Sequence, residues 1–199
     1  MKLQINALLR RPAQGFLSLL FATLVLAGCG GGGSSDGASA DTRSAFATGP
    51  ITGFGSIIVN GVRFDDSSAS VSDDDGNSRR NDELRLGMMA EIESSGISTD
   101  SRGSHSKARS IRFGSEIVGP VFSVAADGKS LVVLGQTVAI TATTLFDDRL
   151  VSGLAGLVPN TSVVEVHAML DAATGVYTAT RIEPKSNPQF FKLRGLVSN

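Results

Sequence analysis

The chain has 199 residues, of which 41% are hydrophobic and 19% are charged, with 18 Lys and Arg against 19 Asp and Glu. This balance excludes a basic nucleic-acid-binding protein held mainly by phosphate contacts, and it excludes a long acidic disordered tail. The single cysteine excludes a disulfide framework and a zinc or iron–sulfur site built from cysteines.

Residues 1–28 have the pattern of a signal peptide. Lys2, Arg10 and Arg11 form a positive amino-terminal region, and the apolar run 16–27 follows it. That run is shorter than the roughly 20 residues that a membrane-spanning helix needs, and its length is typical of a signal peptide.

The apolar run ends in Leu26-Ala27-Gly28-Cys29, which resembles a bacterial lipobox. The small residues before the cysteine suit the signal peptidase, and the Cys29 thiol then carries the lipid. The alternative is an ordinary secretory signal beside a chance cysteine. We expect an exported cell-envelope protein anchored to the membrane through Cys29. Gly30, rather than aspartate, favours the outer membrane, by resemblance to enterobacterial lipoproteins.

Residues 29–48 predict a flexible tether between the lipid and the folded part. Gly, Ser and Ala dominate the segment, and it shows no apolar period that would bury a core. We therefore expect residues 1–48 to pack on neither folded unit.

Two stretches that follow Gly49 resemble each other and predict an internal repeat with units 49–116 and 117–188. The matched segments occur in the same order in both units. They are 49–51 with 119–121, 56–61 with 130–135, 64–66 with 146–148, 90–92 with 164–166, and 108–111 with 179–182.

Each unit is typical of short strands, because runs of Ile, Val, Thr and Phe alternate with Gly, Asn and Asp. A unit of about 65–70 residues is too small for a sandwich and suits a closed barrel without exposed edges. We predict an all-β fold with two tandem small OB-like β-barrels after the signal peptide and tether. The only helical candidate is 148–157, where leucines recur at helical spacing and two glycines weaken the pattern.

The last residues, 189–199, resemble the opening strand of a third repeat, since 195–197 matches 119–121. A lone strand leaves backbone groups unpaired. We expect this segment to pair with an edge of the second unit or to stay poorly ordered.

The opening segment 49–65, GPITGFGSIIVNGVRFD, resembles the start of bacterial lipoproteins that carry repeats of the domain of unknown function 5666. Segments 86–88, 117–121 and 134–138 are also similar to that family. The resemblance covers nearly all of 49–199. It implies an exported protein of tandem β-barrels without an established activity, so it assigns no catalytic residue.

The acidic run 73–77 invites a calcium hypothesis, but its spacing fails. An EF-hand loop that begins at Asp73 needs glycine at its sixth position and glutamate at its twelfth, where Ser78 and Leu84 stand. We interpret the run as an exposed, mobile, solvated loop whose residues favour turns. The sequence predicts no metal site and no cofactor.

Two acidic pairs, Asp65-Asp66 and Asp147-Asp148, occupy similar places in the two units. Adjacent residues on an extended segment point to opposite faces, so they are poorly placed to act together as acid and base. Strand-end turns explain their recurrence, and we predict no catalytic residue.

We interpret both histidines as structural residues rather than as catalytic residues or metal ligands. His105 lies in a polar segment, and we expect it to be an exposed loop residue. His167 follows Glu165 by two residues on the polar face of a strand, so a His–Glu pair is geometrically available. Since no third ligand is evident, a surface pair between strands is favoured over a metal site.

These observations predict a non-enzymatic, lipid-anchored envelope protein with a structural or binding role. One alternative is a glycan- or protein-binding module on a barrel face, and another, less favoured, is a hydrolase that uses acids at the barrel rim. The expected partners are the membrane, through the lipid on Cys29, and an envelope protein or glycan. With no Trp and one Tyr, few rings are available to stack on sugars or on bases, and no nucleic-acid partner is predicted.

Overall fold

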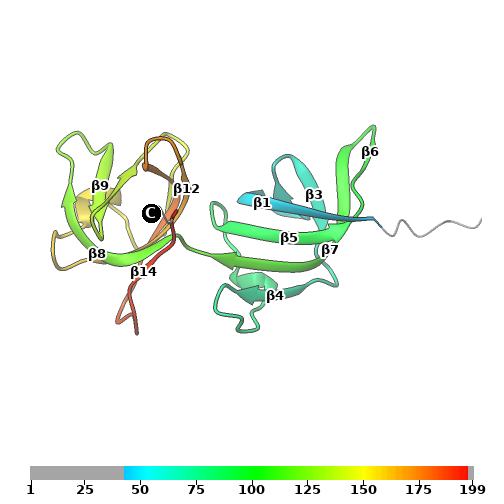
Figure 1. Ribbon diagram of the computed structural model, residues 1–199, viewed down its shortest axis with the longest axis horizontal. Helices are drawn as coiled ribbons and strands as arrows, with labels where there is room; N and C mark the ends of the chain where they lie inside the picture. The colour runs from blue at the N-terminus through cyan, green and yellow to red at the C-terminus, as the bar shows by residue number, and fades with distance from the viewer. Residues whose placement is uncertain (1–42, 197–199) are drawn as a thin grey trace, which may run out of the picture. The chain divides into compact units, whose positions relative to one another are not determined.

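The computed structural model describes residues 43–196, which form two closed five-stranded β-barrels in tandem (Figure 1). The prediction of an all-β fold with two tandem OB-like barrels is confirmed. The predicted signal peptide, Cys29 and most of the predicted tether lie outside the described residues. Within residues 43–196, no helix is long and apolar enough to cross a membrane.

The first barrel contains seven strands and one short 3₁₀ helix. They are β1 (Ser44–Gly53), β2 (Ile57–Val59), β3 (Val62–Asp65), β4 (Ser70–Asp73), η1 (Asn81–Glu83), β5 (Met89–Ser95), β6 (Ser98–Asp100) and β7 (Gly103–Gly114). Five of the strands close a ring in the order β1–β2–β3–β7–β5 and back to β1. The β3–β7 pairing is parallel and the other ring pairings are antiparallel, as in an OB-like barrel.

The second barrel repeats this arrangement. Its elements are β8 (Ile117–Val124), β9 (Ser130–Val133), β10 (Gln136–Ala139), β11 (Leu145–Phe146), η2 (Gly153–Gly156), β12 (Val163–Leu170) and β13 (Tyr177–Pro184). The ring runs β8–β9–β10–β13–β12 and closes through the parallel β10–β13 pair. The predicted helical candidate forms only η2, where Leu154 is buried.

The strand registers confirm the repeat. Gly49 pairs with Ala90 in the first barrel, and Gly119 pairs with Val164 in the second, as the matched segments require. Each opening strand also carries a β-bulge at the same place, after Ile51 in β1 and after Val121 in β8. The two barrels therefore share details of backbone geometry as well as strand order.

The predicted match between segments 64–66 and 146–148 is wrong. Phe64 lies in β3 and pairs with β7, whereas Phe146 lies in β11, a strand that corresponds to β4. The position equivalent to Phe146 is Val71, because Val71 pairs with Ile111 as Phe146 pairs with Ile182. Each phenylalanine precedes two aspartates, but the strand pairings place the two segments at different positions in their barrels.

Each barrel encloses its own hydrophobic core. The first core contains Ile51, Ile57, Val59, Phe64, Val71, Leu84, Met88, Ala90, Ile92, Ala108 and Ile111. The second contains Ile117, Val121, Leu131, Val133, Val138, Leu154, Leu157, Val164, Val166, Ala168, Tyr177, Ala179 and Ile182. Most of these residues alternate along their strands with outward-facing positions, as closed barrels require.

The boundary predicted between tether and barrel is wrong by five residues. β1 begins at Ser44, and residues 44–48 pair with β5 up to Ser95. Backbone hydrogen bonds hold this half of the strand, so it needs no strongly apolar side chains. The small residues that suggested a tether therefore do not prevent strand formation.

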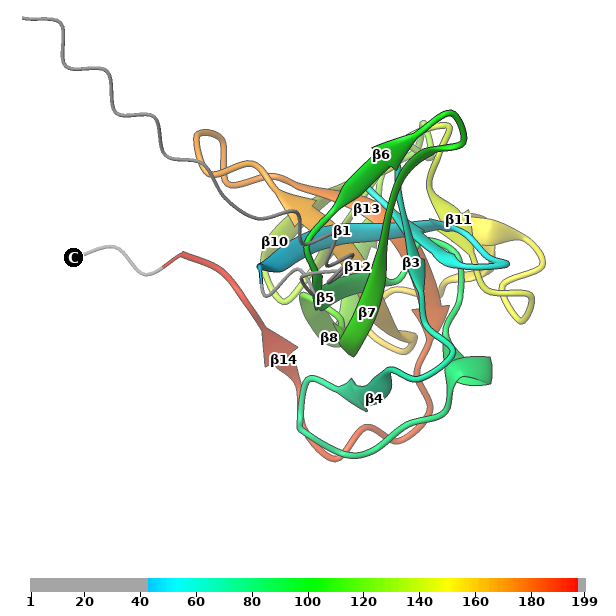
Figure 2. The same ribbon diagram turned by 90° about the vertical axis from the view of Figure 1, so that its right-hand side faces the viewer.

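The segment that contains His105 also differs from the prediction. Residues 94–106 form the end of β5, the short strand β6 and the start of β7, which project as a hairpin (Figure 2). His105 is a half-buried residue of β7, paired with Ser98 on one side and Arg63 on the other. It lies on a sheet face rather than in a loop.

The carboxy-terminal segment pairs with the second barrel, as predicted. Strand β14 (Lys192–Leu193) pairs antiparallel with Val118 and Ile117 of β8. Neither barrel needs this strand for closure, because β3–β7 and β10–β13 complete the rings.

We expect deletion of residues 189–199 to leave both barrels folded and to lower the free energy of unfolding by about 1–2 kcal/mol, the cost of a few exposed hydrogen bonds and ion pairs. Urea denaturation followed by circular dichroism measures this loss. Cooperative unfolding of the second barrel in the truncated chain would instead make β14 its essential closing strand.

Candidate functional site

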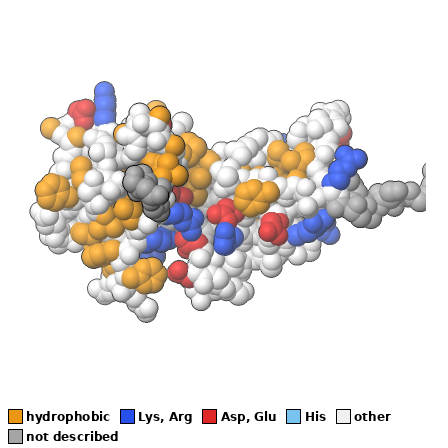
Figure 3. Space-filling model, viewed as in Figure 1, with side chains coloured by type: hydrophobic (Ala, Val, Ile, Leu, Met, Phe, Trp, Pro, Cys, Tyr) orange, Lys and Arg blue, Asp and Glu red, His pale blue; other side chains and the backbone are white. Residues whose placement is uncertain are grey.

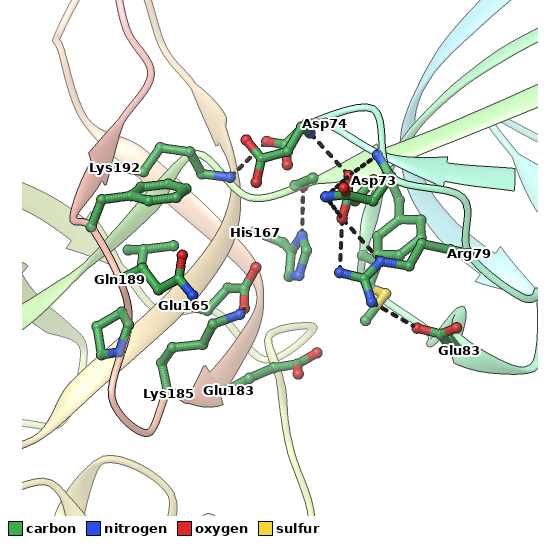
Figure 4. Close-up of a pocket in the computed structure, with 18 residues that line it drawn as sticks. Asp73, Asp74, Arg79, Glu83, Glu165, His167, Glu183, Lys185, Gln189 and Lys192 are labelled. Atoms are coloured by element: carbon green, nitrogen blue, oxygen red, sulfur yellow. Dashed lines mark hydrogen bonds and ion pairs between the residues drawn. The ribbon is translucent and has the colours of Figure 1, made fainter.

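A cavity of about 510 Å³ is lined by residues of both barrels (Figure 4). The first barrel contributes side chains from β4, from the loop after it and from η1, and the second contributes β12, β13 and the segment before β14. The charged side chains that line it are Asp73, Asp74, Asp75, Arg79, Glu83, Glu165, Glu183, Lys185 and Lys192. Acidic and basic side chains also lie intermixed on the surface in Figure 3.

The buried Asp73 carboxylate holds the acidic loop together through hydrogen bonds. Its carboxylate accepts hydrogen bonds from the Asn77 amide at 2.8 Å and from Arg79 at 2.8 and 2.9 Å. Burial raises the pKa of Asp73, but the bonds from Asn77 and Arg79 outweigh it, so its pKa lies below the usual value. The interpretation of this run as a solvated loop is wrong at Asp73, which is 7% exposed.

Asp74 binds the carboxy-terminal segment. Its carboxylate accepts hydrogen bonds from Lys192 at 2.6 Å and from Arg194 at 3.0 Å. A Cβ atom on Gly114 would lie 2.5 Å from this carboxylate, so the glycine leaves the space that Asp74 occupies. The acidic run therefore makes ion pairs within the chain.

His167 of the second barrel contacts the end of the β5–β7 ladder of the first. Its Nδ1 lies 2.8 Å from the Gly114 carbonyl oxygen and 3.4 Å from the Met89 amide nitrogen. The carbonyl only accepts, so the shorter contact assigns the ring proton to Nδ1. Nε2 is buried without a hydrogen-bond partner among the described residues.

The prediction that His167 forms a surface pair is wrong, because this side chain is 1% exposed. The polar alternation of β12 is real, but the first barrel covers its outer face at His167. Burial lowers the pKa of His167, and the neighbouring Glu165 carboxylate opposes that effect only in part. The imidazole is therefore neutral near pH 7.

Glu165 is committed to an ion pair with Lys185, whose Nζ donates to Oε2 at 2.5 Å. Burial raises the pKa of Glu165, and the bond and charge of Lys185 more than offset the increase. His167 and Glu165 are thus close enough to interact electrostatically, but the carboxylate stays ionised.

Two further polar contacts join the barrels beside the cavity. The Thr180 hydroxyl donates to the Gly87 carbonyl at 2.7 Å, and Arg181 reaches the Leu86 carbonyl at 3.4 Å. Arg181 is 8% exposed and is neutralised by Asp147 at 3.0 Å and by Glu183. Asp147, which belongs to the second of the two acidic pairs noted in the sequence, therefore forms an ion pair with Arg181.

The other acidic pair serves turns near β3. Asp65 accepts the Ser67 amide at 3.1 Å, and Asp66 accepts the Asn81 side chain at 3.0 Å. The hydrogen bonds from Ser67 hold the pKa of Asp65 below its usual value. The interpretation of Asp65-Asp66 as a strand-end turn agrees with these contacts.

Glu116 was not singled out by the sequence patterns. It lies between β7 and β8, and its carboxyl accepts the Ala168 amide at 2.8 Å. Burial raises the pKa of Glu116 to about 7, although the Ala168 amide and the Arg194 and Lys192 charges oppose the increase. The one sequence signal for a buried acid here was the position of Glu116 directly before the apolar residues 117–118.

Most of the acids that line the cavity form ion pairs within the chain. Asp73, Asp74, Glu165 and Glu183 each hold a cation of the same chain. Within residues 43–196, no three His, Cys, Asp or Glu side chains come together as a metal-binding group.

The fold, together with the contacts that join the two barrels (the junction), defines a protein of tandem OB-like barrels. Residues 118–183, most of the second barrel, match the model of the family described as domain of unknown function (DUF5666). The comparisons with curated proteins and with solved structures found no match.

Proposed function

We propose that this protein is an exported lipoprotein of the bacterial cell envelope, and that its two barrels have a non-enzymatic binding or structural role. The observation that carries the proposal is the box Leu26-Ala27-Gly28-Cys29 at the end of a charged and apolar leader. The lipid on Cys29 would hold the chain to a membrane, which Gly30 suggests is the outer membrane.

The contacts at the junction support the non-enzymatic part of this proposal. His167, Thr180 and Arg181 each contact a backbone carbonyl of the first barrel. Side chains that could act as acids, bases or nucleophiles are thus used to hold two barrels together. The two barrels then form one larger unit that can present a binding surface beside the membrane.

We expect Cys29→Ala to abolish incorporation of radiolabelled palmitate and to leave an uncleaved precursor, because the peptidase and the lipid transfer both require the thiol. Ser35→Ala, a change six residues along the tether, is the matched control and retains labelling. Labelling of Cys29→Ala, or a mature amino terminus at another residue of the wild-type chain, would refute the lipoprotein assignment.

Sorting is tested separately by sedimentation of membranes from an enterobacterial host. The wild-type chain is expected in the outer-membrane fraction, and Gly30→Asp is expected to shift it to the inner membrane. Recovery of the wild-type chain in the inner membrane would overturn the outer-membrane location.

A further inference from the structure

The outer face of the β3–β7 pair on the first barrel carries an open hollow of about 540 Å³, lined by Ser56, Arg63, Asp65, Arg102, His105 and Ser106. Strand register places Arg63 opposite His105, and Asp65 opposite Lys107, so these side chains share the outer face. Ser56 comes from the turn between β1 and β2, and Arg102 from the turn between β6 and β7. A single patch thus gathers strand and loop residues.

The second barrel shows that the barrel itself does not require these charges. By strand register, Thr137, Ala139 and Thr178 of the second barrel correspond to Arg63, Asp65 and Lys107 of the first. Val176, the residue before β13, corresponds to His105. Those four residues are uncharged, yet the ring closes in the same way. The charged side chains on the first barrel are therefore not required for barrel closure.

The basic groups of this face are partly free. Arg102 is held by Asp100 at 2.8 Å. By contrast, Arg63 and Lys107 make no ion pair within 4.0 Å among residues 43–196, although the charge of Lys107 acts on the facing Asp65 carboxylate and helps to lower its pKa. An exposed guanidinium with its donors unused is suited to a carboxylate, which it can hold through two parallel hydrogen bonds.

The scarcity of aromatic rings on this face argues against a single-stranded nucleic acid as its ligand. OB folds bind oligosaccharides and oligonucleotides on the face of their second and third strands, beside the loops that join the first and second strands and the fourth and fifth strands. Here β3 belongs to that face, and Ser56 and Arg102 come from the two corresponding loops. Nucleic-acid binding relies on several aromatic rings that stack on successive bases. The strand positions of this face carry no Phe, Tyr or Trp, and the adjoining turn carries one such ring, Phe54, which is 50% exposed.

We propose that the outer β3–β7 face of the first barrel binds an acidic oligosaccharide, with Arg63 holding a sugar carboxylate and Lys107 contributing a second positive charge. The proposal goes beyond the envelope role above and does not depend on the lipid anchor. Failure of palmitate labelling would leave it intact, and failure of sugar binding would leave the anchor intact.

The test measures binding of oligogalacturonate to the full chain in detergent by isothermal titration calorimetry. We expect the wild-type chain to bind, with affinity that falls as salt is added. Arg63→Thr, which installs the residue that the second barrel has at this position, is expected to weaken binding at least fivefold. Lys107→Thr is expected to weaken it by a smaller factor.

Arg80→Thr is the matched control, because it removes the same charge from an exposed position outside this face. It is expected to retain wild-type affinity, and circular dichroism checks that all variants keep the β fold. Equal affinities of wild type and Arg63→Thr, or no binding by the wild type, would overturn the proposal. Equal binding of neutral dextran, or Arg63-dependent binding of oligothymidylate in place of the sugar, would overturn the acidic-saccharide assignment.

Discussion

Gly87→Ala is expected to lower the free energy of unfolding by about 3 kcal/mol or more, from backbone strain and overpacking together. Gly87 has a φ of +82°, a region that L-residues with a side chain rarely adopt. A Cβ atom there would lie 2.6 Å from the Thr180 carbonyl oxygen and 3.0 Å from the Arg181 Cβ. The clash is with backbone of the second barrel, which cannot move away as a flexible side chain can.

Gly61→Ala is the matched control for this prediction. Gly61 has a φ of +76°, but nothing lies within 4 Å of the added Cβ. Its replacement is expected to cost only the conformational strain, about 1 kcal/mol. Urea denaturation of both variants separates the two contributions. Equal losses in the two variants would show that Gly87 is not pressed against the second barrel.

Glu116→Gln is expected to stabilise the protein above pH 8 and to have little effect at pH 4. In the folded protein, burial raises the pKa of Glu116 from 4.5 to about 7, which corresponds to about 3 kcal/mol. Below pH 4.5 both the folded and unfolded states hold the proton, so the carboxyl carries no penalty. Between pH 4.5 and 7 the folded state binds more protons, so stability falls as pH rises.

Glutamine removes that penalty because it has no charge to bury, and its amide oxygen still accepts the Ala168 N–H. Glu93→Gln, an exposed change on β5, controls for the loss of one negative charge. The measurement is the free energy of unfolding from urea titrations at pH 4, 6 and 8. A gain at pH 8 no larger than that of the control would contradict burial of an ionised Glu116.

His167 contributes to the pH dependence with the opposite sign. Its pKa in the folded protein is lowered by burial, so the unfolded state takes up a proton first as pH falls below about 6.5. The stability linked to His167 is therefore lost at acid pH, whereas the penalty linked to Glu116 appears as pH rises. Replacing one of these two residues should leave unchanged the pH dependence of stability that is linked to the other.

Local sequence determined the parts of this fold that depend on neighbours along the chain. Runs of β-branched residues separated by turn residues predicted the strands, and Asn60-Gly61 stands at the positive-φ turn between β2 and β3. The matched segments predicted two copies of one barrel, because strands that repeat in order and spacing pair in the same register. Only Phe146 was assigned to the wrong strand, since a short phenylalanine–aspartate match does not specify a pairing partner.

The tertiary structure decided what covers each face. Period-two alternation shows which side chains of β12 lie together, but it does not show that the first barrel buries His167. The contacts of Gly114 with His167 and of Gly87 with Thr180 join residues 53 and 93 positions apart. Similarly, the first residues of β1 are strand because β5 supplies their backbone partners. Burial and pairing of this kind depend on surfaces that exist only after both barrels have closed, so no local pattern contains them.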